Sequence, residues 1–263
     1  FDNVYDWERG TTAEQVRGCA LAAQPDRLHR YVFMSSVAAY FEGLGHEESD
    51  KLAPADCPDE YARNKALSER ALFKLHQQRG LPLVTFRPPY VYGPGNPFYR
   101  EAFFWDRLLL GRPIVVPGDG SRLMQFVHVQ DLVTCCVRSL EEPSAVGEAF
   151  NVAHAEPVTQ LEVVEALAAA AGKIPEIVFV PRDLIEREGG NQMREPLYFG
   201  TYFDMPPITT KIEKARERLH FEPLSFAEGL EQTFAAYLES GTRRTEIDFR
   251  FEDRLIALAG KSI

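Results

Sequence analysis

A tyrosine and a lysine stand four residues apart, at Tyr61 and Lys65, in a stretch whose apolar spacing predicts a helix. Side chains at this spacing share one face of a helix. A neighbouring ammonium group favours the phenolate and lowers the tyrosine pKa from its usual value of about 10 toward neutral pH. Tyr61 could then take or give a proton in catalysis. Ordinary pairs on a helix surface have the same spacing.

Two serines, Ser35 and Ser36, follow a short apolar run, 31–34, that predicts a buried parallel strand. Ligands of open α/β sheets bind at the carboxyl ends of strands, so the chain would bring a hydroxyl to the same sheet edge as Tyr61. That hydroxyl could hydrogen-bond a substrate oxygen. The alternative is that both serines only cap the strand end.

The surrounding elements predict an α/β protein. Helices are expected near 12–24 and 59–78, and strands at 31–34 and 83–86. This order is typical of a parallel, doubly wound, Rossmann-like sheet. Further helices are expected near 99–110 and after capping-box patterns, which begin at Thr11, Thr159 and Ser225. The charged segment beyond Gly241 is expected to lie on the surface.

Four segments resemble the extended short-chain dehydrogenase/reductases, also called the NAD-dependent epimerase/dehydratase family. They are FMSSVAAY at 33–40, YARNK at 61–65, RPPYVYGPG at 87–95 and FVHVQD at 126–131. Their order and spacing fit the family, and 150–152 with 210–223 extend the likeness to nearly the whole chain.

The resemblance implies a role for each residue of the set. Tyr61 would be the acid/base, Lys65 would hold the nicotinamide ribose and tune Tyr61, and Ser36 would orient the substrate oxygen. The residues implied to contact the cofactor, NAD or NADP, are Ser35, Tyr61, Lys65, Pro88 and Pro89. The small-molecule substrate would be a secondary alcohol or ketone, with a sugar derivative as the family default. Dehydrogenation, epimerisation and dehydration all stay open.

The resemblance also implies an architecture. Residues 1–88, with 128–152 returning to them, would form a partial Rossmann domain, and 89–127 with 153–240 a smaller C-terminal substrate lobe. Residues 241–263 would be a charged tail. A homodimer through the helices near 12–24 and 59–78 would follow the family habit.

The chain departs from the family pattern in three places. No G-x-x-G-x-x-G phosphate loop occurs in it, and since the family places that loop upstream of Phe1, we expect the first strands to be missing. Tyr90 stands where nucleotide-sugar members have an asparagine, and Met124-Gln125 replaces an Arg-Asp pair whose arginine grips the substrate diphosphate. Arg122 could substitute for that arginine. The residues expected to contact the substrate are Ser36, Tyr90, Arg122 and Met124.

There are two alternatives to the interpretation of the chain as an enzyme. The chain also resembles the chloroplast stem-loop-binding proteins, which share this fold and a similar Met-Gln replacement, so a non-catalytic or RNA-associated protein is the main alternative. The intact Ser36, Tyr61 and Lys65 set favours the enzyme, and an RNA binder should show a basic, salt-sensitive surface. The remaining alternative is a fragment that is inactive alone because its sheet edge is open.

Composition favours a globular protein with a full core, since 45% of the 263 residues are hydrophobic and 26% charged. The net charge of −10 makes nucleic acid an improbable partner. The four cysteines have neither disulfide nor metal spacing, which indicates a reducing, cytoplasmic location. No run approaches 18 apolar residues, so no membrane span is predicted. The acidic loop around His46 is more typical of solvated carboxylates than of a metal site.

Overall fold

The computed structural model describes residues 10–23 and 27–260, and these fall into two compact units. Unit 1 contains the described residues up to Val91 together with 125–155 and 208–223. Unit 2 contains 92–124, 156–207 and the described residues from 224 onward.

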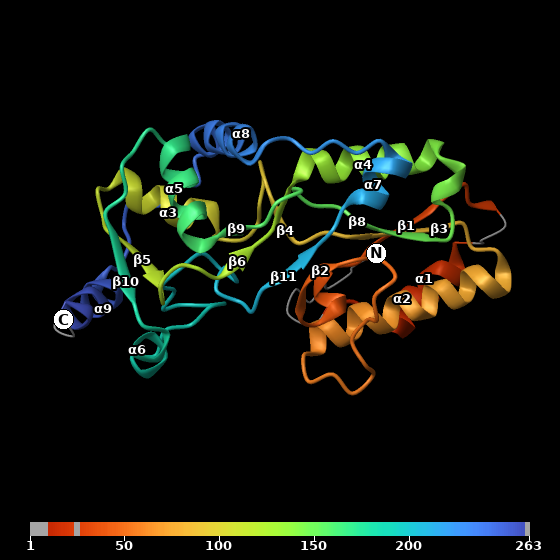
Figure 1. The fold of residues 1–263 in the computed structure, drawn as a ribbon, viewed down its shortest axis with the longest axis horizontal. Coiled ribbons are helices and arrows are strands. Elements are labelled where there is room, and N and C mark those ends of the chain that lie inside the picture. Colours follow the sequence, from red (N-terminus) through yellow and green to blue (C-terminus); the bar gives the residue numbers. More distant parts are fainter. Residues whose placement is uncertain (1–9, 24–26, 261–263) are drawn as a thin grey trace. The chain divides into compact units, whose positions relative to one another are not determined.

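Unit 1 alternates strands and helices along the chain (Figure 1). Its helices are α1 (Ala13–Ala22), α2 (Glu60–Arg79), α4 (Val129–Glu141) and α7 (Glu213–Leu219), with short 3-10 turns η2 (Val37–Tyr40) and η3 (Pro143–Ala145). Its strands are β1 (Tyr31–Met34), β2 (Gly43–His46), β3 (Leu83–Arg87), β7 (Phe126–His128), β8 (Glu148–Asn151) and β11 (Ile208–Thr210). The strand β4 (Tyr90–Tyr92) pairs with β7 and leads into unit 2.

The central sheet of unit 1 has the strand order β1-β3-β8, and all of its pairs are parallel. Apolar side chains of β1 and β3 pack against α1 and α2, with Phe33 and Leu83 among them. On the other face, Phe86 and Phe150 pack with residues of α4 and α7. Figure 1 shows these two helix pairs on opposite sides of the sheet. The predicted parallel α/β, Rossmann-like architecture is therefore confirmed for this unit.

The helix α2 carries the Tyr61-Lys65 pair and has well-defined ends. At its start, the Asp59 side chain accepts a hydrogen bond from the backbone N–H of Ala62. At its end, Gly80 takes the left-handed conformation with φ of 66°, which a residue without a Cβ adopts at little cost. The helix therefore spans Glu60–Arg79, close to the predicted range of 59–78.

The three capping boxes predicted from sequence do cap helices, one of them in a shifted register. Thr159 and Ser225 start helices as expected, each with a glutamate three residues on. The first box is predicted at Thr11, but the structure places it one residue later. Thr12 caps α1, together with Gln15. Gln can close a capping box as Glu does, so both registers fit the sequence pattern.

Unit 2 packs helices around a small amount of sheet. Its helices are α3 (Glu101–Leu109), α5 (Gln160–Ala170), α6 (Arg182–Arg187), α8 (Phe226–Glu239) and α9 (Arg250–Ala259). Its strands are β5 (Ile114–Pro117), β6 (Leu123–Met124), β9 (Val158–Thr159) and β10 (Ile177–Val180), of which β5 and β10 pair in parallel. Aromatic side chains of α3 are fully buried in this unit, with Phe104 against Phe199 and Trp105 against Tyr237.

The charged segment beyond Gly241 is expected on the surface, and residues 241–249 are mostly exposed, but α9 buries one of its faces. Leu255 of α9 is fully buried, and Glu252 forms a buried ion pair with Arg107 at 2.6 Å. The helix contacts β10. Its charges conceal an amphipathic pattern in which Phe251, Leu255 and Leu258 recur at helical spacing.

None of the described helices combines the length and the apolar character that crossing a bilayer requires.

Candidate active site

Backbone hydrogen bonds hold Ser36 at the carboxyl edge of the central sheet. The N–H of Ser35 donates to the Phe86 carbonyl at 2.8 Å, and that of Val37 donates to the Pro88 carbonyl at 3.1 Å. The pairing of β1 with β3 thus continues past the end of β1 and brings Ser36 next to Pro88. The Ser36 hydroxyl accepts a hydrogen bond from the Ala38 N–H at 3.2 Å and so caps η2. Its own proton stays available for an acceptor.

Tyr61 and Lys65 lie together on α2, with Lys65 Nζ 5.5 Å from the centroid of the Tyr61 ring. Lys65 is only 3% exposed, and its ammonium donates to the Met34 carbonyl at 2.9 Å. Burial lowers the pKa of Lys65 to about 8, against the opposing effect of the Glu69 carboxylate. Because η2 packs against α2, the segment that begins at Ser36 contacts the helix that carries Tyr61.

The backbone of Gly10 lies close to the Cδ2 and Cε2 atoms of the Tyr61 ring. Gly10 has φ of +67°, and a Cβ on it would lie 3.2 Å from Tyr61 Cδ2 and 3.7 Å from Lys65 Cε. A side chain at this position would be strained and crowded, so the close approach requires glycine. Gly10 was not among the residues predicted from the sequence.

Arg87 and Glu69 form a buried ion pair next to Ser35, and this pair was not predicted from the sequence. Arg87, the last residue of β3, donates through Nη2 to Glu69 Oε2 at 2.6 Å and through Nε to both carboxylate oxygens. Glu69 also accepts the Ser35 hydroxyl at 2.5 Å. Glu69 follows Lys65 by four residues on the same face of α2 as Tyr61, and that spacing was the one signal in the sequence that pointed to it.

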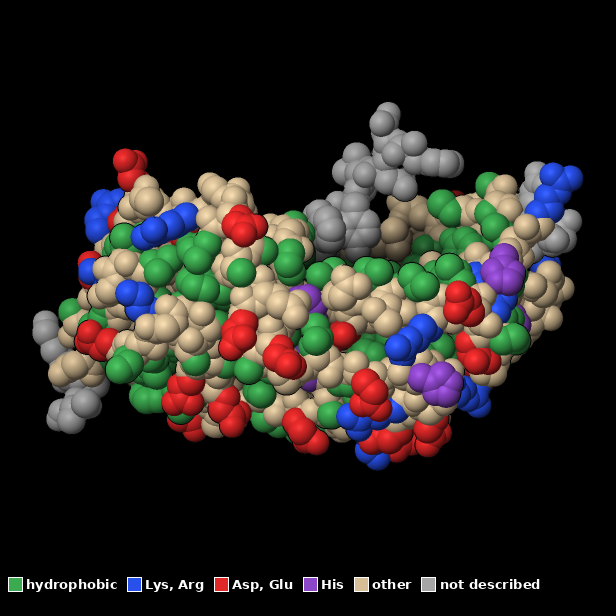
Figure 2. Space-filling view, turned by 90° about the horizontal axis from the view of Figure 1, so that it is seen from above, with side chains coloured by type: hydrophobic (Ala, Val, Ile, Leu, Met, Phe, Trp, Pro, Cys, Tyr) green, Lys and Arg blue, Asp and Glu red, His purple; other side chains and the backbone are tan. Residues whose placement is uncertain are grey.

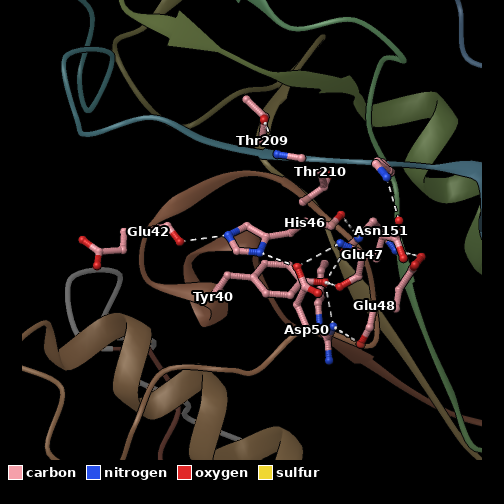
Figure 3. Close-up of polar contacts among 12 residues, drawn as sticks. Tyr40, Glu42, His46, Glu47, Glu48, Asp50, Asn151, Thr209 and Thr210 are labelled. Carbon is pink, nitrogen blue, oxygen red and sulfur yellow. Dashed lines mark hydrogen bonds and ion pairs between the residues drawn. The ribbon is translucent and has the colours of Figure 1, made fainter.

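Arg87 also joins a polar network around the loop after η2, in which Figure 3 labels Tyr40, His46, Asp50 and Asn151. Arg87 Nη1 donates to the Tyr40 hydroxyl at 2.7 Å, and that hydroxyl lies 2.9 Å from Asn151 Oδ1. The His46 ring stacks on the Tyr40 ring at 4.3 Å, and its Nδ1 lies 2.8 Å from Asp50 Oδ2. This bond lowers the pKa of Asp50.

The pairing of β2 with β11 also holds the loop, with the Gly45 N–H donating to the Thr209 hydroxyl at 2.8 Å. Among the residues that the structure describes, no group of three or more His, Cys, Asp or Glu side chains could hold a metal ion.

The other residues predicted to contact cofactor or substrate fall in both units. Pro88 is buried and Pro89 half-buried directly after β3, and the half-buried ring of Tyr90 lies 5.6 Å from that of Phe126. The remaining two predicted residues, Arg122 and Met124, belong to unit 2. In unit 1 the structure therefore places Ser36 next to Pro88, and it places Tyr61 with Lys65 on the helix that η2 contacts.

The two candidates in unit 2 have internal partners. Met124 is buried. Arg122 forms an ion pair with the buried Asp204 carboxylate at 2.9 Å, and Asp204 also accepts from Arg182 Nε at 3.0 Å. In unit 1, Gln125, which replaces the family's aspartate, is buried and bonds the backbone of Thr210 and His154, so its role in this structure is to join loops.

The comparisons with known proteins agree with this architecture. A model of the NAD dependent epimerase/dehydratase family matches residues 12–153, which is more than half of the chain. The chloroplast stem-loop binding protein of 41 kDa b of Arabidopsis thaliana is 33% identical over 98% of this chain and 64% of its own length. An uncharacterized UDP-glucose epimerase, YtcB, of Bacillus subtilis is 28% identical over 83% of this chain and 63% of its own length.

Among solved structures, UDP-glucuronic acid 4-epimerase from Bacillus cereus in complex with NAD has the same fold. Its TM-score is 0.67 at 22% identity, over 86% of this chain and 66% of that one. The chain thus spans slightly less than two thirds of the length of these three proteins. The matched range includes Ser36, Tyr61, Lys65 and the β1-β3-β8 sheet. The chain belongs to the NAD-dependent epimerase/dehydratase family, the extended short-chain dehydrogenase/reductases.

Proposed function

We propose that the protein is an NAD(P)-dependent enzyme that oxidises or reduces a secondary alcohol or ketone of a sugar derivative. This step would be either the whole reaction or one stage of an epimerisation or dehydration. The observation that carries the proposal is the pairing of a buried lysine with Tyr61 on α2, beside the sheet edge at which Ser36 is held.

The three side chains divide the work. Tyr61 removes the proton of the substrate hydroxyl, or returns it, at its phenolic oxygen. Lys65, when protonated, stabilises the phenolate because its ammonium lies 5.5 Å from the ring in a site from which water is largely excluded. Ser36 has a hydroxyl proton to donate to the substrate oxygen, since its lone pair already binds the Ala38 N–H.

The residues present fit the nicotinamide end of a dinucleotide. Lys65 has three N–H donors, and within the described part of the chain Met34 is its one hydrogen-bond partner, so two donors remain for ribose hydroxyls. The half-buried ring of Pro89 offers an apolar surface next to Pro88, which is itself buried beside Ser36. When bound, the nicotinamide supplies or accepts the hydride. NAD is the first choice of cofactor, because the B. cereus epimerase was solved with NAD.

A nucleotide-linked sugar is the substrate class that the names of the relatives suggest, since they are called epimerases of UDP-sugars. Tyr90 and Arg122 remain candidates for contacts to it, while the burial of Met124 favours a packing role. Arg122 would have to leave Asp204 to bind a diphosphate.

The proposal also covers the roles of the two units, the oligomeric state and the location of the protein. Unit 1 would be the dinucleotide-binding domain and unit 2 the substrate lobe, and α1 with α2 would form a homodimer interface. A cytoplasmic protein fits the four cysteines, all of which are free thiols.

The test is a fluorescence titration of the complete natural protein with NADH and NADPH, followed by a screen of UDP- and dTDP-sugars. Saturable binding of a dinucleotide, with turnover of at least one sugar nucleotide that Tyr61→Phe abolishes, is expected. Failure to bind either dinucleotide would refute the proposal.

One observation favours a second function, which is RNA stem-loop binding: the Arabidopsis stem-loop binding protein is similar over nearly the whole chain. Charge argues against it. The net charge is −10, and on the face drawn in Figure 2 the Lys and Arg side chains lie among Asp and Glu. An electrophoretic shift assay with an RNA stem-loop at increasing salt tests this function, and tight, salt-sensitive binding would support it.

A further inference from the structure

Two side chains of α2, one helical turn apart, hold consecutive residues at the end of β1. The Lys65 ammonium donates to the Met34 carbonyl at 2.9 Å, and the Glu69 carboxylate accepts the Ser35 hydroxyl at 2.5 Å. Ser36 is the next residue along the chain. The position of its hydroxyl relative to α2 therefore depends on both contacts.

Arg87 fixes the Glu69 carboxylate in turn. Three hydrogen bonds of 2.6–3.1 Å join the guanidinium to the carboxylate, and both side chains are at least 95% buried. Arg87 also donates to the Tyr40 hydroxyl, at the end of the 3-10 turn that Ser36 caps. The ion pair thus reaches both flanks of Ser36, through Ser35 on one side and Tyr40 on the other.

We infer that Glu69 and Arg87 are positioning residues of the active site, whose ion pair sets the place of Ser36 relative to Tyr61 and Lys65. The inference rests on the proposed function, because it assigns the pair to the proton-transfer step. A buried pair is costly to desolvate and is weak support for stability alone, which leaves geometry as its contribution.

The pair also influences Lys65 electrostatically. Among the residues that the structure describes, the charged or titratable groups near Lys65 are Tyr61 and Glu69 of α2, with Arg87 of β3 acting through Glu69. The strand β1 contributes only the Phe33 ring and the Met34 carbonyl. Since the Glu69 carboxylate raises the Lys65 pKa, Glu69→Gln should lower it below its value of about 8.

The test uses the complete protein and the Ser35→Ala variant, which removes only the hydroxyl that Glu69 holds. Its matched control is Ser139→Ala in α4, which deletes another buried serine hydroxyl, bonded to the Cys136 carbonyl at 2.7 Å. We expect Ser35→Ala to lower kcat by about 10- to 100-fold at nearly unchanged KM, Ser35→Thr to restore most of it, and the control to keep wild-type kcat. Equal kcat for Ser35→Ala and the control would overturn the inference.

A second measurement does not depend on turnover. In protein labelled with 15N-lysine, the Nζ resonance of Lys65 is assigned through Lys65→Arg and titrated with pH in wild type and Glu69→Gln. A lower midpoint in Glu69→Gln supports the inference, and an unchanged midpoint contradicts it. If the wild type shows no turnover, the proposed function fails, while this titration still decides whether Glu69 acts on Lys65.

Discussion

Lys65 Nζ lies 5.5 Å from the Tyr61 ring and donates to the Met34 carbonyl, although the lysine is almost completely buried. A buried ammonium is unfavourable for folding, so the position of Lys65 costs stability that an apolar side chain would not. Residues kept at such a cost are candidates for function.

The burial of Lys65 predicts a pH-dependent stability difference. Its folded-state pKa of about 8 lies below the unfolded value of 10.5, so the unfolded chain holds the extra proton between these pH values. The free energy of unfolding of the wild type should therefore rise, relative to Lys65→Met, as the pH increases from 8 to 10.5, by about 1.4 kcal/mol for each unit of pKa difference. Urea unfolding of both proteins across this range measures it, and a constant difference would show that the lysine is not desolvated.

Two helical glycines should respond in opposite directions to alanine. Gly229 of α8 packs against Tyr92, so a methyl group there would overlap the tyrosine oxygen. We expect Gly229→Ala to lower the free energy of unfolding by about 1–3 kcal/mol. Gly18 of α1 is exposed with open space around it. Gly18→Ala should therefore raise the free energy of unfolding by about 0.5–1 kcal/mol, because alanine has the higher helix propensity. Thermal unfolding of both variants gives the comparison, and a stabilised Gly229→Ala would contradict the packing of Tyr92.

Two buried threonines form a second contrast. Thr85 in the central strand β3 is fully buried, and its hydroxyl has no hydrogen-bond partner among the described residues. Thr85→Val should raise the free energy of unfolding by about 1 kcal/mol, because it removes an unsatisfied polar group at nearly constant shape. Thr233 donates to the Gly229 carbonyl at 2.6 Å, and Thr233→Val should lower stability by a similar amount. Chemical denaturation distinguishes the two, and a destabilised Thr85→Val would reveal a hidden partner such as a buried water.

The C-terminal helix α9 should contribute to the stability of unit 2. Leu255→Ala should lower the free energy of unfolding by about 2–5 kcal/mol, because Leu255 is fully buried. The control is Leu238→Ala in α8, whose side chain is 57% exposed, and there we expect a change of at most about 0.5 kcal/mol. Equal effects of the two substitutions would mean that α9 does not pack in solution.

Local patterns in the sequence were sufficient to predict β1, β3, α2 and the Tyr61-Lys65 pair, because strand runs, capping residues and i, i+4 spacing are properties of short segments. The Glu69-Arg87-Ser35 contacts were not predictable, since they join residues 18 and 34 positions apart across a helix and two strands. The error at Thr12 arose because two capping registers overlap. At α9, the many charges concealed the apolar face.

The most direct test of the central claim is the comparison of wild type with Tyr61→Phe in the complete protein. Dinucleotide binding is measured by fluorescence, and hydride transfer to or from the bound nicotinamide by absorbance at its reduced band. We predict that the variant binds the dinucleotide with nearly wild-type affinity and loses turnover by at least about 100-fold, because only the proton-transfer group is removed. Turnover of Tyr61→Phe at the wild-type rate would contradict the assignment of Tyr61 as the acid/base.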